Sequence, residues 1–265
     1  MAGSISDFLE NAWLDHICNV SKTPTEHVYL ALGTARTDSA LTELSGNGYT
    51  REEITFAAAS GRAIVQSGDV EFGPVTTTAW SAVDEWAIFD ASTGGNMLAA
   101  GSFSAAKDCN VGRSPKVVSG EIQVSVSAGG LSTTWANNLL NRFFRNITSG
   151  TAKPSTYVAL CASAPADADT DISAKEISGN NYSPVQVNVN GGTSPTWDLA
   201  ASGVVDNTHE ITFPTPSGTW AVTHMAIKET STTGNLIFWA DITDESCGSG
   251  DPVSFPAGSL DITVV

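Results

Sequence analysis

The sequence predicts a mainly β fold made of two homologous antiparallel β-sandwich-like domains, each preceded by an N-terminal α-helix. Three observations lead to this fold class. First, the segment ELSGNGYT at 43–50 returns as EISGNNYS at 176–183, within a longer series of segments that recurs in the same order. Second, only 15% of the residues are charged, while Gly, Ser, Thr and Asn are frequent, which is typical of short strands and turns. Third, several segments alternate apolar and polar residues with the period of a strand.

The recurring segments define a duplicated unit of roughly 130 residues, which is a common size for one domain. Landmark residues such as Trp80 and Trp220 occupy the same place in the two copies. The stretch SAGG at 127–130 reads as a brief flexible link between the copies. We therefore expect a first helix-plus-β repeat at residues 1–127 and a second at 128–265.

Each repeat opens with a helix. In the first, Ser6 or Asp7 can cap the helix, and one face carries Phe8, Leu9, Trp13, Leu14 and Ile17. In the second, residues 131–146 place Trp135, Leu139, Leu140, Phe143 and Phe144 on the equivalent stripe. Both stripes are predicted to face a core, and His16 is predicted to be solvated or to have a capping role.

Six strands follow in each repeat, after Pro24 and Pro154 end the helices. The first set is expected at residues 27–33, 53–59, 69–73, 84–90, 96–103 and 120–127. The second set is expected at 156–162, 185–191, 210–214, 223–229, 235–242 and 258–265. The segments STGGN and STTGN read as hairpin turns between the fourth and fifth strands. Strands at this spacing suit an antiparallel sandwich.

The twice-used SGN(G/N)Y segment, called here the SGN box, is predicted to be a tight turn with an aromatic anchor and to have a structural role. It comprises Gly46, Asn47, Gly48 and Tyr49 in the first copy, and Gly179, Asn180, Asn181 and Tyr182 in the second. Glycine and asparagine tolerate the positive φ that such turns need. Trp80 and Trp220 recur just before the fourth strand, which favours a core or corner role.

Charge and composition exclude several function classes. Lys and Arg total 12 against 28 Asp and Glu, giving a net charge of −16, which disfavours binding to nucleic acid or to anionic membranes. The N-terminal segment lacks a secretion signal, and no stretch reaches the ~20 apolar residues that a membrane span needs. We expect a soluble product made in a cytosol.

The four cysteines form neither a disulfide framework nor a zinc motif. Cys109 and Cys247 share one position in the two repeats, where they are either small loop residues kept by duplication or thiols that bridge subunits. Cys18 and Cys161 lie in apolar patterns that indicate core thiols.

Catalytic, cofactor-binding and metal-ligating residues are not predicted. The four histidines lack metal-ligand spacing, and the usual nucleophile and phosphate-loop motifs do not occur. The segment DADTD places Asp167, Asp169 and Asp171 as calcium loops do, but Ile172 and Ser178 stand where an EF-hand needs Gly and Glu. Solvated carboxylates are the preferred interpretation there, with calcium as the alternative.

Several segments, in order, resemble small bacteriophage structural proteins described as tail fibre proteins or virion decoration proteins. In the first repeat these are SISDFLENAWLDHI, VYLALGT, ELSGNGYTREEITF and AIFDASTGGNML. In the second they are EISGNNYS, ITFPTPSGTW, MAIKETSTTGNLIFWADI and FPAGSLDITV. The second repeat departs from the pattern in its opening helix and in the loop at 162–176.

The resemblance implies a non-enzymatic virion component that binds the major capsid protein or tail proteins and copies of itself. A capsid decoration or cement protein is ranked first, because a duplicated domain can cover two related lattice positions. A tail, tail-fibre or adaptor component is the alternative. A carbohydrate-binding module would instead need exposed indoles at Trp80, Trp197, Trp220 or Trp239. A hydrolase would need a pocket of facing carboxylates or histidines that the sequence does not reveal.

Overall fold

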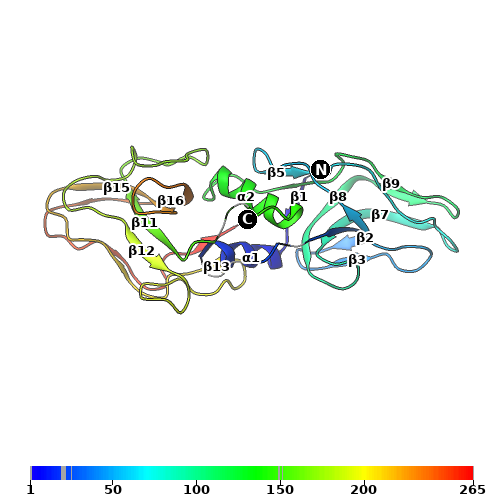
Figure 1. Ribbon diagram of the computed structural model, residues 1–265, viewed down its shortest axis with the longest axis horizontal. Coiled ribbons are helices and arrows are strands. Elements are labelled where there is room, and N and C mark those ends of the chain that lie inside the picture. Colours follow the sequence, from blue (N-terminus) through cyan, green and yellow to red (C-terminus); the bar gives the residue numbers. More distant parts are fainter. Residues whose placement is uncertain (1, 19–21, 25, 149, 151, 265) are drawn as a thin grey trace.

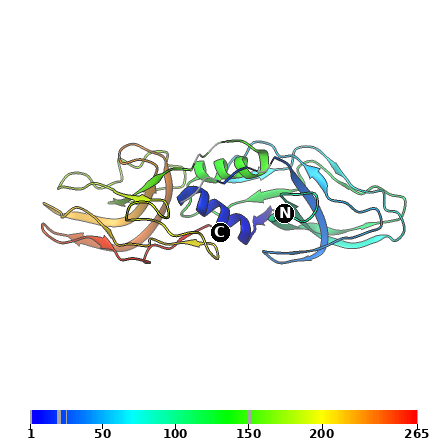
Figure 2. The same ribbon diagram turned by 60° about the horizontal axis from the view of Figure 1, so that its bottom comes forward.

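The computed structural model describes residues 2–18, 22–24, 26–148, 150 and 152–264. The molecule is elongated, with one β-rich body at each end and both helices between them (Figure 1). Figure 2 shows the same arrangement from a second direction, and both chain termini lie near the middle of the molecule.

The first repeat contains helix α1 and ten strands. The helix is α1 (Asp7–Cys18), and the strands are β1 (Ala2–Ile5), β2 (Val28–Arg36), β3 (Leu41–Glu43), β4 (Glu52–Ile54), β5 (Ala63–Val65), β6 (Val70–Glu71), β7 (Trp80–Phe89), β8 (Met97–Cys109), β9 (Lys116–Val117) and β10 (Gln123–Ser125). An eight-stranded sheet has the order β3-β2-β7-β8-β1-β10-β5, with β4 also paired to β2, and β6 pairs separately with β9.

The second repeat contains helix α2 and eight strands. The helix is α2 (Thr133–Arg145), and the strands are β11 (Ser155–Cys161), β12 (Val185–Asn188), β13 (Val204–Val205), β14 (Ile211–Thr212), β15 (Trp220–Lys228), β16 (Leu236–Cys247), β17 (Ser254–Phe255) and β18 (Ile262–Thr263). The sheet β12-β11-β15-β16 is accompanied by the pairs β13-β18 and β14-β17.

The strand pairings of the two repeats correspond. The ladder β2-β7-β8 has its counterpart in β11-β15-β16, the pair β5-β10 in β13-β18, and the pair β6-β9 in β14-β17. All of these pairings are antiparallel. The predicted fold class is confirmed: the protein is mainly β, with antiparallel sheets and one helix at the start of each repeat.

Two details differ from the sequence prediction of the first helix. Phe8 is 45% exposed and does not face the core, because it lies one position before the buried stripe that begins at Leu9. His16, predicted to be solvated or capping, is fully buried. Its Nδ1 accepts the backbone N–H of Lys22 at 3.0 Å, and its Nε2 lies 2.5 Å from the carbonyl oxygen of Gly150 in the other repeat. The imidazole is therefore satisfied inside the protein by two backbone groups.

Each helix begins in its own repeat and is held by the other. The Ser132 side chain accepts a hydrogen bond from Trp135 N at the start of α2, and the Ser6 side chain accepts one from Leu9 N beside α1. The backbone N–H of Ser6 donates to Leu98 and that of Ser132 to Ile237, so each cap is fixed to its own sheet.

The opposite face of each helix hydrogen-bonds to the partner repeat. Asn11 of α1 accepts the backbone N–H of Gly203 at 2.9 Å, and the aligned Asn137 of α2 accepts that of Arg62 at 3.0 Å. About one helical turn further along, Asp15 accepts Ala200 N and Asn141 accepts Ala59 N, both at 2.9 Å. The duplication is thus folded about a pseudo-twofold axis, with the helices at its centre.

The two helices also belong to one hydrophobic core that includes residues of both repeats. One cluster of buried residues runs from Ile5 to Val264 and includes members of both repeats. Trp13 of α1 and Phe143 of α2 lie with ring centroids 6.4 Å apart within it. The two β-rich bodies therefore share one continuous core. Within the described residues, neither helix has the length and apolar character of a membrane span.

Candidate functional site

The SGN boxes form two equivalent turns. Asn47 and Asn180 adopt φ values of 51° and 50°, in the left-handed region that asparagine and glycine tolerate. In each turn the N–H of the tyrosine donates to the carbonyl of the first glycine at 2.9 Å, Tyr49 to Gly46 and Tyr182 to Gly179. Gly48 has φ of 81° and an added Cβ would lie 2.1 Å from a backbone oxygen, so this position of the first box requires glycine.

The tyrosine of each box anchors the turn to the sheet. The Tyr49 hydroxyl accepts Leu32 N at 3.0 Å and donates to Glu43, while Tyr182 accepts Leu160 N at 2.8 Å and donates to Glu176. Burial raises the pKa of both phenols well above the ordinary range, so each remains a hydrogen-bond donor.

An aromatic group of identical geometry surrounds each tyrosine. Tyr49 stacks on Phe72 at 6.2 Å and meets Trp80 edge-on at 5.6 Å. In the second repeat Tyr182 stacks on Phe213 at 6.3 Å and meets Trp220 edge-on at 5.4 Å. Trp80 and Trp220 are 4% and 1% exposed. Each box is a turn packed against buried aromatic rings, and the indoles offer no face to a sugar ring.

The glutamate that accepts the tyrosine hydroxyl is paired with a cation, and that cation comes from a different segment of the chain in each repeat. In the first repeat Arg51 binds Glu43 at 2.7 Å and lies over the ring of Phe89. In the second, Pro184 aligns with Arg51 and Lys228 aligns with Phe89, and Lys228 forms the ion pair with Glu176. Both cations also donate to a backbone carbonyl of a hairpin turn. Arg51 donates to Gly94, between β7 and β8, and Lys228 donates to Thr232, between β15 and β16. Both repeats therefore contain the same network of tyrosine, glutamate and cation, although the cation comes from a different position in the sequence.

The remaining predicted residues occupy separate places. Cys109 is partly buried and Cys247 is 7% exposed, and both lie opposite tryptophans, Trp80 and Trp220, in their strand pairs. Neither is part of a disulfide within the described chain. Desolvation raises the pKa of Cys109, which makes its thiol less reactive. A disulfide between subunits remains a prediction for these cysteines, and Cys109 is the more accessible of the two.

Cys18 and Cys161 are buried, at 1% and 0% exposure. Desolvation raises the pKa of Cys161 to about 12, so this thiol stays protonated.

The aspartates of DADTD do not converge on a common point. Asp167 accepts Trp239 Nε1 at 2.8 Å and Gly129 N at 2.9 Å, and lies 3.5 Å from the Arg62 guanidinium. Asp169 binds Lys175 at 2.6 Å, and Asp171 accepts two hydrogen bonds from Ser173. Within the described part of the chain, no three His, Cys, Asp or Glu side chains are placed to hold a metal. The calcium alternative is therefore not supported by this loop.

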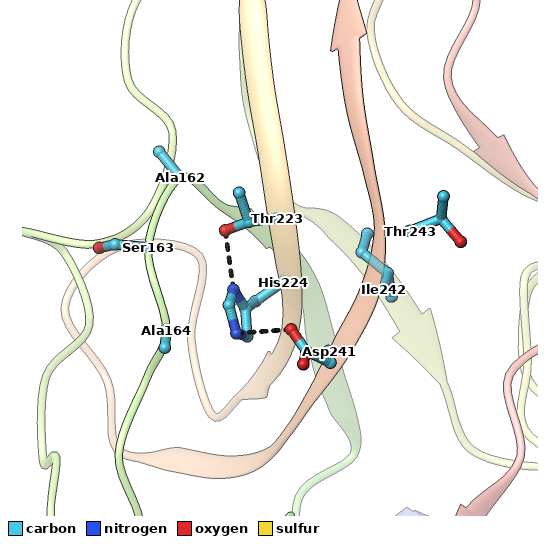
Figure 3. A pocket seen from close by; sticks show the side chains of 8 residues that line it. All are labelled: Ala162, Ser163, Ala164, Thr223, His224, Asp241, Ile242 and Thr243. Atoms are coloured by element: carbon cyan, nitrogen blue, oxygen red, sulfur yellow. Dashed lines mark hydrogen bonds and ion pairs between the residues drawn. The ribbon is translucent and has the colours of Figure 1, made fainter.

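An open cavity of about 770 Å³ lies beside β15 and β16. Figure 3 shows the side chains that line it. His224 Nε2 lies 2.8 Å from Asp241 Oδ1, and His224 Nδ1 lies 2.7 Å from the Thr223 hydroxyl. A register shift between Val222 and His224 allows these neighbouring side chains to meet. Hydroxyl, imidazole and carboxylate follow one another as in hydrolytic triads.

Two observations argue against a triad at this cavity. The Asp241 side chain is 86% exposed, so water competes for the carboxylate that would have to orient the imidazole. The Thr223 hydroxyl donates to the carbonyl oxygen of Cys161 at 3.4 Å, so its proton is shared with the backbone. In the first repeat the aligned pair is Glu85 and Ser102, joined by hydrogen bonds of 2.9 and 3.0 Å. The position carries a cross-strand polar pair in both repeats, with different residues.

Comparison with known families decides the affiliation. The profile of the family described as podophage GP4 fiber I protein gp80 matches residues 4–125 and matches again at residues 130–263. The chain belongs to this family. The two matches stand in tandem in this fiber-family protein, which agrees with a duplicated phage structural protein. A search of the curated proteins found no match.

Sequence reasoning missed the residues that join the repeats. Arg62, at 8% exposure, donates to the carbonyl oxygens of Val126, Ser127 and Leu131 in the link between the repeats. Asn11 and Asn137 occupy the same position in the two repeats, outside the apolar stripes of their helices. This shared asparagine was the sequence feature that could have indicated a contact between the repeats. The remaining tryptophans named for sugar binding are Trp197, which is fully buried, and Trp239, which is partly exposed and bonded to Asp167.

Proposed function

We propose that this protein is a non-enzymatic fiber component of a podophage particle, which uses its two β-rich bodies to contact other virion proteins. The single observation that carries this proposal is the match of both repeats to the fiber I family. The shared core and the reciprocal helix contacts support it, because they join the bodies into one stiff element. Mechanical continuity is what a fiber needs and what a flexible pair of domains would lack.

Capsid decoration, the first-ranked interpretation of the sequence, now ranks second. The family description names a fiber, while the two related faces of a duplicated domain still suit a lattice. The carbohydrate-binding interpretation loses most of its basis, because Trp80, Trp197 and Trp220 are buried. The partners that we propose are therefore protein surfaces of the same particle.

Locating the protein on intact particles tests the proposal. Gold-labelled antibodies raised against the full chain should decorate the fibers in negative-stain images, and an averaged density map should accommodate the elongated molecule there. Label spread evenly over the head faces would overturn the fiber assignment and favour decoration. An antibody against the major capsid protein provides the matched control, since it must label the head alone.

A further inference from the structure

The N-terminal strand completes the first repeat by filling a space between two other strands. Ser4 and Ile5 pair antiparallel with β8, and Ala2 and Gly3 pair parallel with β10. Strand β1 therefore lies between β8 and β10 and joins them into one sheet. Without β1, both of these strands would present an open edge.

The corresponding segment of the second repeat fills only half of the equivalent space. Leu131 bridges Phe238, and Trp239 N donates to Gly130 at 2.7 Å, as the aligned part of β1 does on β8. The chain then turns away, because Gly129 N is held by Asp167 and Ser127 is held by Arg62. As a result β16 ends its sheet, and β13-β18 remains a separate pair.

The space left between β16 and β18 is a cavity of about 390 Å³, called here the strand slot. Met225, Ile227 and Phe238 provide its apolar lining. Trp239 N–H points toward this side, and backbone groups alternate along a strand, so the N–H and C=O of Asp241 face the slot as well. The slot thus combines a hydrophobic floor with the unpaired backbone groups of a sheet edge, which is what an added strand requires.

The charge of the open slot differs from that of the filled one. Asp241 and Asp261 line the open slot, whereas their aligned counterparts beside β1 are the neutral Ser102 and Gln123. Asp241 Oδ1 also lies 2.8 Å from His224 Nε2, and Asp261 is hydrogen-bonded to Asp206. The two acids stand on opposite walls, on the β16 and β18 sides. An occupant that carries a positive charge between them would gain favourable electrostatic interactions.

We propose that the strand slot binds an extended segment of a partner protein, which adds as a β-strand antiparallel to β16 and parallel to β18. The segment carries small residues, as the Ala-Gly-Ser sequence of β1 does in the homologous space, and at least one Lys or Arg that meets Asp241 and Asp261. The proposal goes beyond the fiber assignment, because strand addition depends on this slot and not on where the protein sits in the particle.

The experiment uses the full chain and two capped synthetic peptides, Gly-Ala-Lys-Ala-Gly and Gly-Ala-Glu-Ala-Gly, which leave out the Ser-Ile-Ser end of β1 because Gly130, Leu131 and Ser132 already fill that half of the space. Amide hydrogen exchange is followed with each peptide at millimolar concentration. The lysine peptide is expected to slow exchange at residues 241–243 and 261–263 at least about fivefold, and to bind at least about fivefold more tightly than the glutamate peptide. Amides at 101–103, on the equivalent strand of the first repeat, serve as the internal reference and should not change.

The variant Asp261→Lys tests the charge argument at an exposed position that leaves the backbone edge intact. It leaves one negative and one positive side chain at the slot, so the preference for the lysine peptide should disappear. The proposal is overturned if neither peptide slows exchange in the slot, or if the preference is unchanged in Asp261→Lys. Neither result would bear on the labelling of particles, so the two proposals fail independently.

Discussion

At the scale of single residues, the duplication provides an internal comparison that a single domain cannot. The carboxylates of Glu43 and Glu176 hold the same place, yet Arg51 neutralises one and Lys228 neutralises the other from a different segment of the chain. Lys228 is 1% exposed, and a buried carboxylate left without its cation is costly. The two repeats thus show two solutions to one electrostatic requirement.

Exchanging these solutions gives the first prediction. Lys228→Phe should lower the free energy of unfolding by about 3 kcal/mol, because Glu176 loses its buried partner. Adding Pro184→Arg, which copies the first repeat, should restore stability to within about 1 kcal/mol. Urea denaturation followed by circular dichroism measures both values. Lys116→Met is the control, since its pair with Asp69 is exposed and its loss should leave the free energy of unfolding nearly unchanged. A double variant as unstable as the single one would contradict the equivalence.

At the scale of elements, the sequence predicts each helix and its buried stripe but not what the helix packs against. The aligned Asn11 and Asn137 show that the helices are related, and the strands are marked by alternation. Strand β1 has no such signal, because four residues of the type Ala-Gly-Ser-Ile form a strand only when β8 and β10 flank them. The burial of His16 was missed for a similar reason, since its acceptor Gly150 lies in the other repeat.

The helix contact through His16 makes stability depend on pH. Burial is the main cause that lowers the pKa of His16 to about 4, with Arg142 and Lys22 adding to the effect against the Gly150 hydrogen bond. The unfolded chain has the ordinary value near 6.5, so it takes up a proton first as the pH falls. The contribution of neutral His16 to the free energy of unfolding is fully present above about pH 6.5, and it is lost as the pH falls from there to about 4.

We therefore expect the free energy of unfolding to fall by on the order of 2 kcal/mol through His16 over this interval, allowing for partial solvent screening. Urea titrations at several pH values measure it. His16→Gln cannot titrate but keeps an amide donor for Gly150, so it should be less stable at pH 7 and should lack this component of the slope. Parallel pH profiles of the two proteins would show that His16 is not the titrating group.

At the scale of the whole molecule, the sequence indicates two repeats, and the structure adds that they share their interior. Residues from both repeats form one buried cluster, and the helices cross-bond to the opposite bodies. Alignment of the copies cannot reveal this, because a chain with two independent domains would give the same internal similarity. The link at Ser127–Leu131 is likewise fixed by Arg62 from outside its own segment.

A shared core predicts cooperative unfolding. The full chain should unfold in a single transition, with tryptophan fluorescence and far-ultraviolet circular dichroism giving the same midpoint. Asn137→Ala should lower the free energy of unfolding by about 1 kcal/mol, and with it the midpoint, without splitting the transition, because its hydrogen bond lies at the junction of the bodies. Asn110→Ala, in an exposed loop, is the control and should leave the midpoint unchanged. Two separate transitions in the wild-type chain would show that the bodies are energetically independent.

The position of the termini near the middle of the molecule has a practical and a mechanical consequence (Figure 1). A fluorescent or affinity tag fused to either terminus would lie near the middle of the molecule and leave both β-rich ends accessible. By the same geometry, a protein attached at either terminus would hold the elongated molecule near its centre and not at one of its ends.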